Sequence, residues 1–306
     1  MQHKSVISQS PRIRKLDSSN TTHQPTSSLL SYAEPDDPWF KRKLIGILEN
    51  LSGKPRLEQI ARKILSSGIP PEKIMGAALQ ELDIHLDIDA SALARIPTDG
   101  PLVFIANHPF GVVDGLAFCE IVSRVRARYA ILVNSVLCRE PRLNRILLPI
   151  DFREIPAAVK VNIRTRQEAV AALARGEAVA IFPSGAVATA PFPGKDPVDL
   201  EWKRFVVKLI RQSNATIVPV FFHGNNSFWF QLASYIHMNL RLGLLLYEVS
   251  NKRSTSLRVS VGDPISPIAW RTKDPLQELL PFLRNTTMAL GRNKEIQDAL
   301  PEGKPA

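Results

Sequence analysis

Apolar residues follow a helical pattern from about position 38 to position 82. Asp37-Pro38 supplies an N-cap and a proline for a first helical turn. The apolar residues that follow recur three or four positions apart: Phe40, Leu44, Ile47, Leu48 and Leu51. This spacing predicts an amphipathic helix that ends near Gly53, and the same periodicity predicts helices over 57–65 and 71–82. Residues 33–83 are therefore expected to form a helical cap.

From Ile84 onward the apolar positions alternate with polar ones, and this period of two predicts a half-buried strand. Later apolar runs also predict strands, over 102–107, 129–134, 178–183, 216–222 and 257–262. Helical patterns lie between these runs, over 115–125, 162–175 and 199–212. Strands that alternate with helices are typical of an α/β fold, so residues 84–290 are expected to form one α/β domain.

The two ends of the chain lack this periodicity. Residues 1–32 are rich in Ser, Thr, Gln and Pro and are expected to be a disordered tail, and residues 291–306 a C-terminal tail. The N-terminal segment has no apolar core of a secretory signal, which predicts residence in the cytoplasm. The longest apolar stretch, 228–249, is interrupted by polar and charged residues. We therefore expect peripheral membrane attachment at most.

Composition narrows the possible partners. The 306 residues are 44% hydrophobic and 22% charged, enough apolar material for a sizeable core. The 39 Lys and Arg residues exceed the 29 Asp and Glu residues, and the net charge of +10 favours an anionic partner. Aromatic residues are not interleaved with basic ones, so a nucleic-acid partner is not expected. The two cysteines predict neither a disulfide framework nor a zinc site.

One histidine lies in a setting suited to proton transfer. His108 directly follows the strand predicted over 102–107, at the carboxyl edge where open α/β sheets place active sites. Pro109 and Gly111 favour a sharp turn, and Asp114 opens the next helix, so the chain can return a carboxylate to the imidazole. A general base needs such a carboxylate. A plainer interpretation also fits, in which Asp114 caps a helix and His108 is a hydrogen-bonded loop residue.

These residues carry a family resemblance. Residues 107–115 read N-H-P-F-G-V-V-D-G, which resembles the N-H-x4-D motif of the PlsC-like glycerolipid acyltransferase superfamily. The spacing of five residues between His108 and Asp114 is similar to that of its haemolysin-like subgroup, the bacterial lysophospholipid and lyso-ornithine-lipid acyltransferases. The family's second block carries an arginine, for which Arg153 is the candidate. The third block, F-P-E-G, has a counterpart in Phe182-Pro183-Ser184-Gly185, with serine in place of glutamate. The fourth, an apolar strand that ends in V-P-V, matches Val218-Pro219-Val220.

The resemblance implies a mixed central sheet flanked by helices and transfer of a fatty acyl group from acyl-CoA or acyl carrier protein. The acceptor would be the hydroxyl of a lysophospholipid or lyso-ornithine lipid, in bacterial phospholipid biosynthesis on the cytoplasmic face of the inner membrane. His108 would be the general base and Asp114 its orienting group. No metal and no bound cofactor are implied. The residues expected at the substrates are Asn107, Gly111, Arg153, Phe182, Pro183, Ser184, Gly185 and Pro219.

Several assignments have alternatives. Ser184 lies on a turn after a strand, as a hydrolase nucleophile does, but Phe182 and Ala186 stand where a nucleophile elbow has glycines. Because glutamate is absent at position 184, a non-catalytic lipid-binding protein of the same fold is also possible. Arg153 fits an ordinary surface arginine as well as a substrate ligand. The basic run Lys41-Arg42-Lys43 suits a solvated helix face or an anionic membrane surface.

Backbone N–H groups near Gly111 or Gly185 are candidates to stabilise an oxyanion, because glycine permits a close approach. The aromatic residues that follow Pro219 are expected to be buried, either in the core or beside an acyl-chain groove. They are Phe221, Phe222, Phe228, Trp229, Phe230 and Tyr235.

Overall fold

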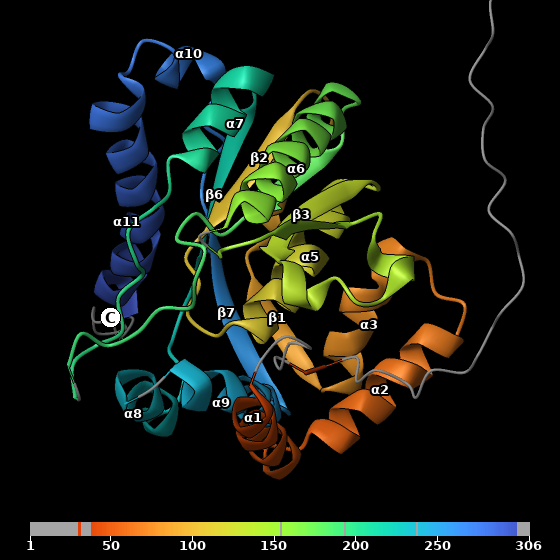
Figure 1. Ribbon diagram of the computed structural model, residues 1–306. Coiled ribbons are helices and arrows are strands. Elements are labelled where there is room, and N and C mark those ends of the chain that lie inside the picture. The colour runs from red at the N-terminus through yellow and green to blue at the C-terminus, as the bar shows by residue number, and fades with distance from the viewer. Residues whose placement is uncertain (1–29, 32–37, 154, 193, 237, 299–306) are drawn as a thin grey trace, which may run out of the picture.

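The computed structural model describes residues 30, 31, 38–153, 155–192, 194–236 and 238–298 (Figure 1). The tail predicted over residues 1–32 therefore lies outside the described residues, except for Leu30 and Ser31. Leu30 packs against the main core, and the Ser31 hydroxyl donates a hydrogen bond to the Glu49 carboxylate at 2.9 Å. These two residues consequently belong to the folded part of the chain.

A seven-stranded mixed sheet forms the centre of the molecule, in the order β1-β7-β6-β2-β5-β3-β4. Its strands are β1 (Ile84–Ile88), β2 (Leu102–Ala106), β3 (Tyr129–Asn134), β4 (Leu147–Ile150), β5 (Ala178–Ile181), β6 (Thr216–Phe222) and β7 (Thr255–Val261). All neighbours are parallel except β6 and β7, which are antiparallel. The predicted α/β class and mixed sheet are confirmed. The sequence pattern missed β4, a four-residue edge strand that contains a proline.

Helices precede, separate and follow the strands. They are α1 (Trp39–Leu51), α2 (Lys54–Ser66), α3 (Ile74–Glu81), α4 (Ala90–Ala94), α5 (Val112–Val125), α6 (Pro156–Ala174), α7 (Phe205–Ser213), α8 (Phe228–Ile236), α9 (Met238–Asn251), α10 (Pro267–Trp270) and α11 (Leu280–Asp298). Short turns of other helical types cover 71–73, 135–137, 141–143 and 275–279.

Three predicted boundaries are wrong. The helix expected over 162–175 begins six residues earlier, at Pro156. The helix expected over 199–212 begins only at Phe205, because residues 199–204 run as a loop toward the carboxyl edge of the sheet. The C-terminal tail was expected from residue 291, but α11 continues to Asp298. The apolar side of α11 packs along β6 up to about Leu290, and its polar continuation keeps the helical hydrogen bonds beyond that point.

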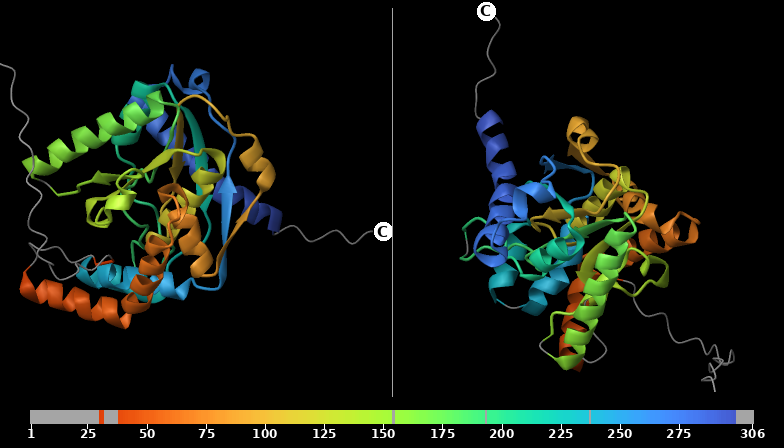
Figure 2. Two further views of the ribbon diagram at one scale, coloured as in Figure 1. Left: turned by 90° about the vertical axis from the view of Figure 1, so that its right-hand side faces the viewer. Right: turned by 90° about the horizontal axis from the view of Figure 1, so that it is seen from above.

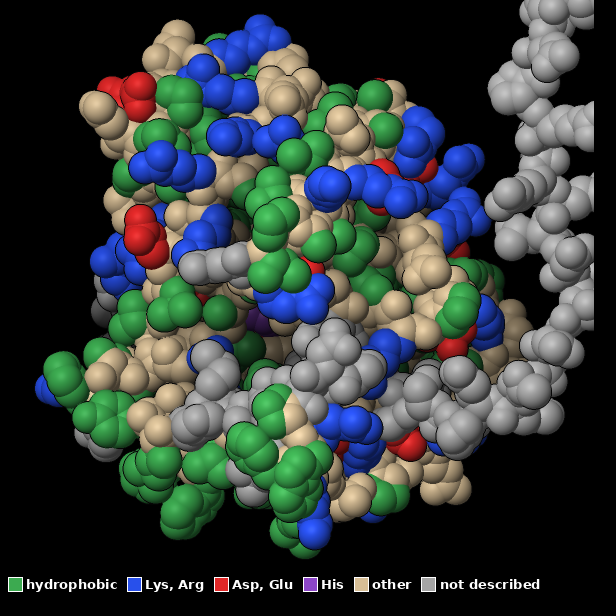
Figure 3. Space-filling model, in the orientation of Figure 1, with side chains coloured by type: hydrophobic (Ala, Val, Ile, Leu, Met, Phe, Trp, Pro, Cys, Tyr) green, Lys and Arg blue, Asp and Glu red, His purple; other side chains and the backbone are tan. Residues whose placement is uncertain are grey.

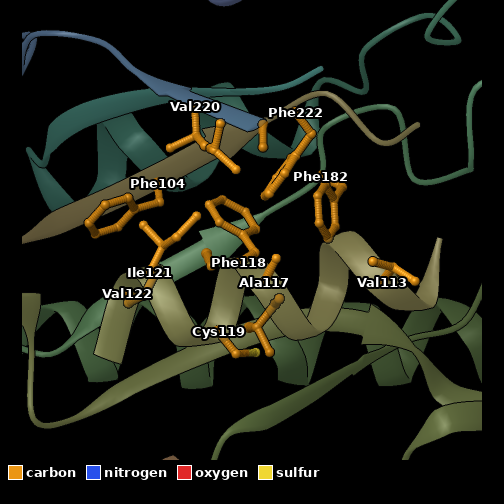
Figure 4. Close-up of a cluster of buried hydrophobic side chains, with 14 of the residues drawn as sticks. Phe104, Val113, Ala117, Phe118, Cys119, Ile121, Val122, Phe182, Val220 and Phe222 are labelled. Carbon is orange, nitrogen blue, oxygen red and sulfur yellow. The ribbon is translucent and has the colours of Figure 1, made fainter. Parts of the chain in front are cut away.

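The sheet is covered on both faces, which explains why its central strands are apolar at every position. All five residues of β2 are buried. Helix α5 covers one face with a cluster that includes Phe104, Phe118 and Phe222 (Figure 4). Helices α6, α7 and α11 cover the other face, around Ile105 and Ile217. Residues of β2 therefore alternate between two cores, and the loop after β2 begins in rigid surroundings.

Helices α1, α8 and α9 lie together beyond one end of the sheet, where β2, β5 and β6 have their carboxyl ends (Figures 1 and 2). Both α1 and α8 pack on α9. The apolar face predicted for α1 is not buried as expected: Ile45 is buried, whereas Phe40, Ile47 and Leu51 are exposed. Glu49 and Ser52 are buried instead, because they pair with Lys54 and with the Gly243 carbonyl.

Candidate active site

The site begins where the central strand β2 ends. Asn107 follows β2 directly, and its side chain joins the ends of two strands. The Asn107 amide donates to the Phe222 carbonyl at 3.0 Å and accepts from the Phe222 N–H at 2.8 Å. Both halves of the amide are thus occupied by the backbone of β6. Asn107 was expected at the substrate, but its side chain is buried, and its hydrogen bonds to β6 fix the start of the loop that carries His108.

The predicted pair is brought together. The Nδ1 atom of His108 lies 3.1 Å from an Oδ1 of Asp114, a residue of the first turn of α5. The second carboxylate oxygen accepts the Phe110 N–H at 2.9 Å, which closes the turn. The carboxylate lies off the direction of the ring N–H, so the distance fits a hydrogen bond while the alignment does not. Asp114 is fully buried, and the His108 side chain is 16% exposed.

The imidazole is held from its flat side as well. Phe182, the residue after β5, stacks on the His108 ring with centroids 3.9 Å apart and an interplanar angle of 20°. Phe182 in turn packs against Phe118 of α5. The His108 carbonyl accepts a hydrogen bond from the Ala188 N–H at 2.7 Å. The loops after β2 and β5 therefore hold one another at the carboxyl edge of the sheet.

A second carboxylate reaches His108 from a part of the chain that the sequence pattern did not indicate. Asp199 Oδ1 accepts the backbone N–H of His108 at 3.1 Å, and its Oδ2 accepts the indole N–H of Trp202 at 2.8 Å. Asp199 is buried, and burial raises the pKa of its carboxyl, against the hydrogen bond from Trp202. The two residues are 91 positions apart, so no motif spacing links them.

Ser184 is a turn residue in the structure. Its side chain is buried, and its hydroxyl donates to the Ala186 carbonyl at 3.0 Å. The Gly185 N–H is likewise used, since it donates to the Phe182 carbonyl at 3.0 Å. The Pro183 carbonyl accepts the Lys203 N–H at 2.8 Å, which ties this turn to the segment before α7. Gly185 was expected to offer an oxyanion donor, and this hydrogen bond removes it from the candidates.

Gly111 must be glycine for two reasons. Its φ of 86° lies in the region that favours glycine, and a Cβ at this position would stand 2.8 Å from Leu245 and 3.1 Å from Val187. The loop therefore packs closely against α9. Gly111 is the N-cap residue of α5, so the first N–H groups of this helix begin next to His108.

Arg153 lies on a loop beside this site. Its guanidinium pairs with the Asp151 carboxylate at 2.7 Å and holds the pKa of that carboxyl below its usual range. The neighbouring Phe152 ring touches the backbone of Gly185, at the place where a Cβ would stand 2.8 Å from it. The Arg153 side chain is half exposed, so it remains open to solvent beside the loop after β5.

Pro219 is not part of this cluster. It lies within β6 with its ring against Gly262, in a hollow that Leu290 of α11 also lines. Its neighbours in β6, Val218 and Val220, face the core that includes Phe182. Pro219 therefore points to the opposite face of the sheet from His108, which does not fit the substrate contact that the sequence motif implied.

Helices α8 and α9 contribute residues that the motifs did not reveal. Arg241 is buried, donates to the Val187 carbonyl at 2.8 Å and lies over the Phe230 ring. Burial lowers the pKa of this guanidinium. Gln231 accepts the Ala190 N–H at 3.0 Å. These two side chains fix the segment that follows Gly185, and only their position on apolar helices, unusual for polar residues, marks them in the sequence.

The aromatic residues after Pro219 divide into three groups. Phe222 and Phe230 are fully buried, as expected, and Phe221 is partly buried with its ring against Gly291 of α11. Phe228, Trp229 and Tyr235 are each more than half exposed, so the prediction that they are buried is wrong.

Within the described part of the chain, no three His, Cys, Asp or Glu residues are grouped as metal ligands. In the same residues, no helix is both long and apolar enough to span a bilayer.

Comparison with known proteins shows that this chain matches a protein family. Residues 52–297 match the profile of the Acyltransferase family. Two similar proteins are each named lyso-glycine lipid O-acyltransferase. The protein from Phocaeicola vulgatus is 29% identical over 211 residues, 65% of this chain and 69% of that protein. The protein from Bacteroides thetaiotaomicron is 27% identical over 213 residues, 65% of this chain and 71% of that protein.

Among solved structures, the 1-acyl-sn-glycerophosphate acyltransferase PlsC from Thermotoga maritima aligns with 84% of this chain and 97% of its own. The sequence identity is 14% and the TM-score 0.44. The family profile spans the sheet, the His108 loop and most of the helices around them. This chain therefore belongs to the Acyltransferase family and is an acyltransferase.

Proposed function

We propose that this protein is a lysolipid O-acyltransferase with His108 as its general base and Asp114 as the group that orients it. The observation that carries this proposal is the 3.1 Å approach of the two side chains at the carboxyl edge of the sheet. The family match and the relatives named as lyso-glycine lipid O-acyltransferases support the reaction class.

In this mechanism the Nε2 atom of His108 takes the proton of the acceptor hydroxyl, because Nδ1 is the ring nitrogen that lies 3.1 Å from Asp114. The hydroxyl oxygen attacks the thioester carbonyl, and a tetrahedral oxyanion forms. Its collapse breaks the C–S bond and gives the ester, and the imidazolium returns the proton to the departing thiolate. No acyl-enzyme is needed. The Asp114 carboxylate balances the positive charge on the ring while the proton resides there.

The oxyanion requires N–H donors that are not already used. Gly185 does not qualify, because its N–H closes a turn. We assign this role to the N–H groups at the start of α5, next to Gly111, where the helix dipole also favours negative charge.

The acceptor that we favour is a lysolipid with an amino-acid headgroup. Both named relatives act on a lyso-glycine lipid by name, and the first sequence motif resembles enzymes for lyso-ornithine lipids and lysophospholipids. Arg153, half exposed beside Gly185, is the candidate contact for an anionic group of the acceptor. Acyl-CoA and acyl carrier protein are both acidic donors, which suits the net charge of +10.

Membrane contact is part of the proposal, because lysolipids reside in bilayers. Trp39 is 74% exposed and Trp229 62% exposed, and each lies on a helix that packs on α9. Figure 3 shows hydrophobic side chains together with Lys and Arg along this lower edge. Arg42 and Lys43 are exposed on α1. This surface suits peripheral binding to an anionic membrane, which we place at the cytoplasmic face of the inner membrane.

Two alternatives are less well supported. A serine hydrolase needs a hydroxyl free to attack, whereas the Ser184 hydroxyl is buried and donates to Ala186. A non-catalytic lipid-binding protein would not need a histidine and a buried carboxylate in contact at the edge of the sheet. The pairing of His108 with Asp114 therefore favours an enzyme.

A turnover assay on the purified full chain tests the proposal. Lyso-glycine lipid, lyso-ornithine lipid and lysophosphatidic acid are each offered with acyl-CoA or acyl carrier protein, and the O-acylated product is measured by mass spectrometry. We expect an ester product with at least one lyso-amino-acid lipid. Free fatty acid as the main product would favour the hydrolase, and binding of lysolipid without turnover would favour the lipid-binding protein.

A further inference from the structure

Asp199 is a buried carboxylate that the proposed mechanism does not yet use. It lies on the loop between β5 and α7, and it contacts His108 through the backbone N–H of that residue. Its two oxygens accept hydrogen bonds from the His108 N–H at 3.1 Å and from the Trp202 indole at 2.8 Å. Each oxygen thus faces an N–H donor, an arrangement that matches the ionised carboxylate.

The surroundings favour an electrostatic effect of this carboxylate on His108. Asp199 and Trp202 are both buried, so little water screens the charge. In the described part of the chain, the contacts of His108 with charged groups are those with Asp114 and Asp199. Phe182 covers one face of the ring, and the Ala188 N–H binds its carbonyl. Among the described residues, no Lys or Arg pairs with either carboxylate in these contacts.

We propose that Asp199 is a positioning residue that holds the backbone of His108 and places a second buried negative charge beside its imidazole. The inference rests on the proposed role of His108 as a general base. The charge favours the imidazolium that forms when His108 takes the acceptor proton, and the hydrogen bond fixes the loop from which the ring projects. Ser184 occupies the position where the family motif has glutamate, so Asp199 is the carboxylate that this loop region brings to the site.

The test measures the pKa of His108 itself by NMR titration of the ¹³C-labelled imidazoles in the full chain. The His108 signal is assigned by its loss in His108→Gln. Asp199→Asn should shift the titration of His108 to lower pH, because a nearby carboxylate favours the charged imidazolium. The acidic limb of the kcat profile should move to lower pH by the same amount, since neutral imidazole then persists at lower pH.

Two controls separate charge from structure. Asp196→Asn removes an exposed carboxylate from the same loop and should leave the His108 pKa unchanged. In Asp199→Asn the new side-chain NH₂ group can face the indole N–H of Trp202, and two donors repel one another. Asp199→Asn is therefore also made in a Trp202→Phe background, which lacks the indole donor. The shift should appear in both backgrounds, and Trp202→Phe alone should not produce it.

Each outcome decides the inference. A His108 pKa that is equal in the folded wild type and in Asp199→Asn would overturn it. Failure of Asp199→Asn to fold in both backgrounds would also overturn it, because Asp199 would then act only as a structural residue. The titration needs no substrate. If the wild type shows no acyl transfer while the shift is observed, the proposed function fails and the electrostatic coupling stands.

Discussion

At the residue scale, His108 receives its contacts from segments with very different separations in the chain. Asp114 and Phe110 belong to the same short loop, so their arrangement around the histidine follows from local spacing and could be predicted. Phe182, which stacks on the His108 ring, belongs to the motif at residues 182–185 and was therefore also among the predicted site residues. Asp199 could not be predicted, because its contact depends on a loop path that apolar periodicity does not encode. The motif therefore located the base and only part of its environment.

Asp114→Asn tests the orienting group. The amide keeps the size of the side chain but cannot balance the imidazolium charge, and its NH₂ can face Nδ1 in place of an acceptor. We expect kcat to fall at least about tenfold while KM for the lysolipid changes little, since the loss affects the transition state. Steady-state kinetics with a defined lysolipid measures both. An unchanged kcat would exclude a role for this carboxylate in turnover.

Ser184→Ala distinguishes a turn hydroxyl from a nucleophile. The substitution removes one hydrogen bond to the Ala186 carbonyl and should cost about 0.5–1.5 kcal/mol of unfolding free energy. Acyl transfer should stay close to the wild-type rate at a temperature where the variant is folded. Loss of turnover together with loss of a covalent acyl-serine detected by mass spectrometry would instead support the hydrolase.

At the element scale, the loop between β2 and α5 is fixed by its fit against α9. Gly111→Ala would place a methyl group 2.8 Å from Leu245 at a φ of 86°, so both packing and backbone oppose it. We expect the unfolding free energy to fall by about 2 kcal/mol or more, measured by urea denaturation.

Gly100→Ala is the matched control for that variant. Its φ of 72° imposes a similar backbone cost, but nothing lies within 4 Å of the added methyl group. It should lose only about 1 kcal/mol. Equal losses in the two variants would show that contact with α9 does not contribute to the stability of the loop.

Helix existence was predictable from the period of apolar residues, whereas helix orientation was not. The spacing of Phe40, Ile47 and Leu51 correctly indicated the helix α1, but these side chains face outward. Periodicity identifies an apolar face without saying what covers it. The start of α7 was misplaced for a related reason. Trp202 precedes Phe205 by three residues, which is a helical spacing, yet Trp202 donates to the Asp199 carboxylate that accepts the His108 N–H.

At the scale of the whole molecule, α1 and α8 give one end of the protein an apolar and basic surface, distant from α10 at the other end (Figures 1 and 2). The double substitution Phe228→Ser and Trp229→Ser should weaken binding to anionic vesicles at least tenfold, because burying one large apolar side chain contributes about 1.5–3 kcal/mol. Both side chains are exposed, so folding should change little. Vesicle co-sedimentation measures the affinity.

Ile268→Ser provides the control, since Ile268 is 86% exposed on α10. It should leave vesicle binding unchanged. High salt or alkaline carbonate should release the wild type from isolated membranes. Release only by detergent would contradict peripheral attachment, and equal effects of the α8 and α10 variants would show that this end of the molecule is not the contact surface.

The topology of the sheet was the least predictable feature at this scale. The order of apolar runs indicated an α/β domain, and the resemblance implied a mixed sheet. Strands β7 and β1 run opposite to the other strands, because after α8 and α9 the chain enters β7 from the end of the sheet at which β6 finishes. That path is set by packing between distant segments, including Glu248 of α9, whose carboxylate holds Ser227 at the start of α8.

The central claim is that His108 removes the proton of the acceptor hydroxyl, and one measurement addresses it directly. Single-turnover acyl transfer to a defined lysolipid is compared between the wild type and His108→Ala, with lysolipid affinity measured separately. A positioned base typically contributes about 10²–10⁴-fold to the rate, so we expect a loss of that size with affinity nearly unchanged. Acyl transfer by folded His108→Ala at close to the wild-type rate would contradict the mechanism.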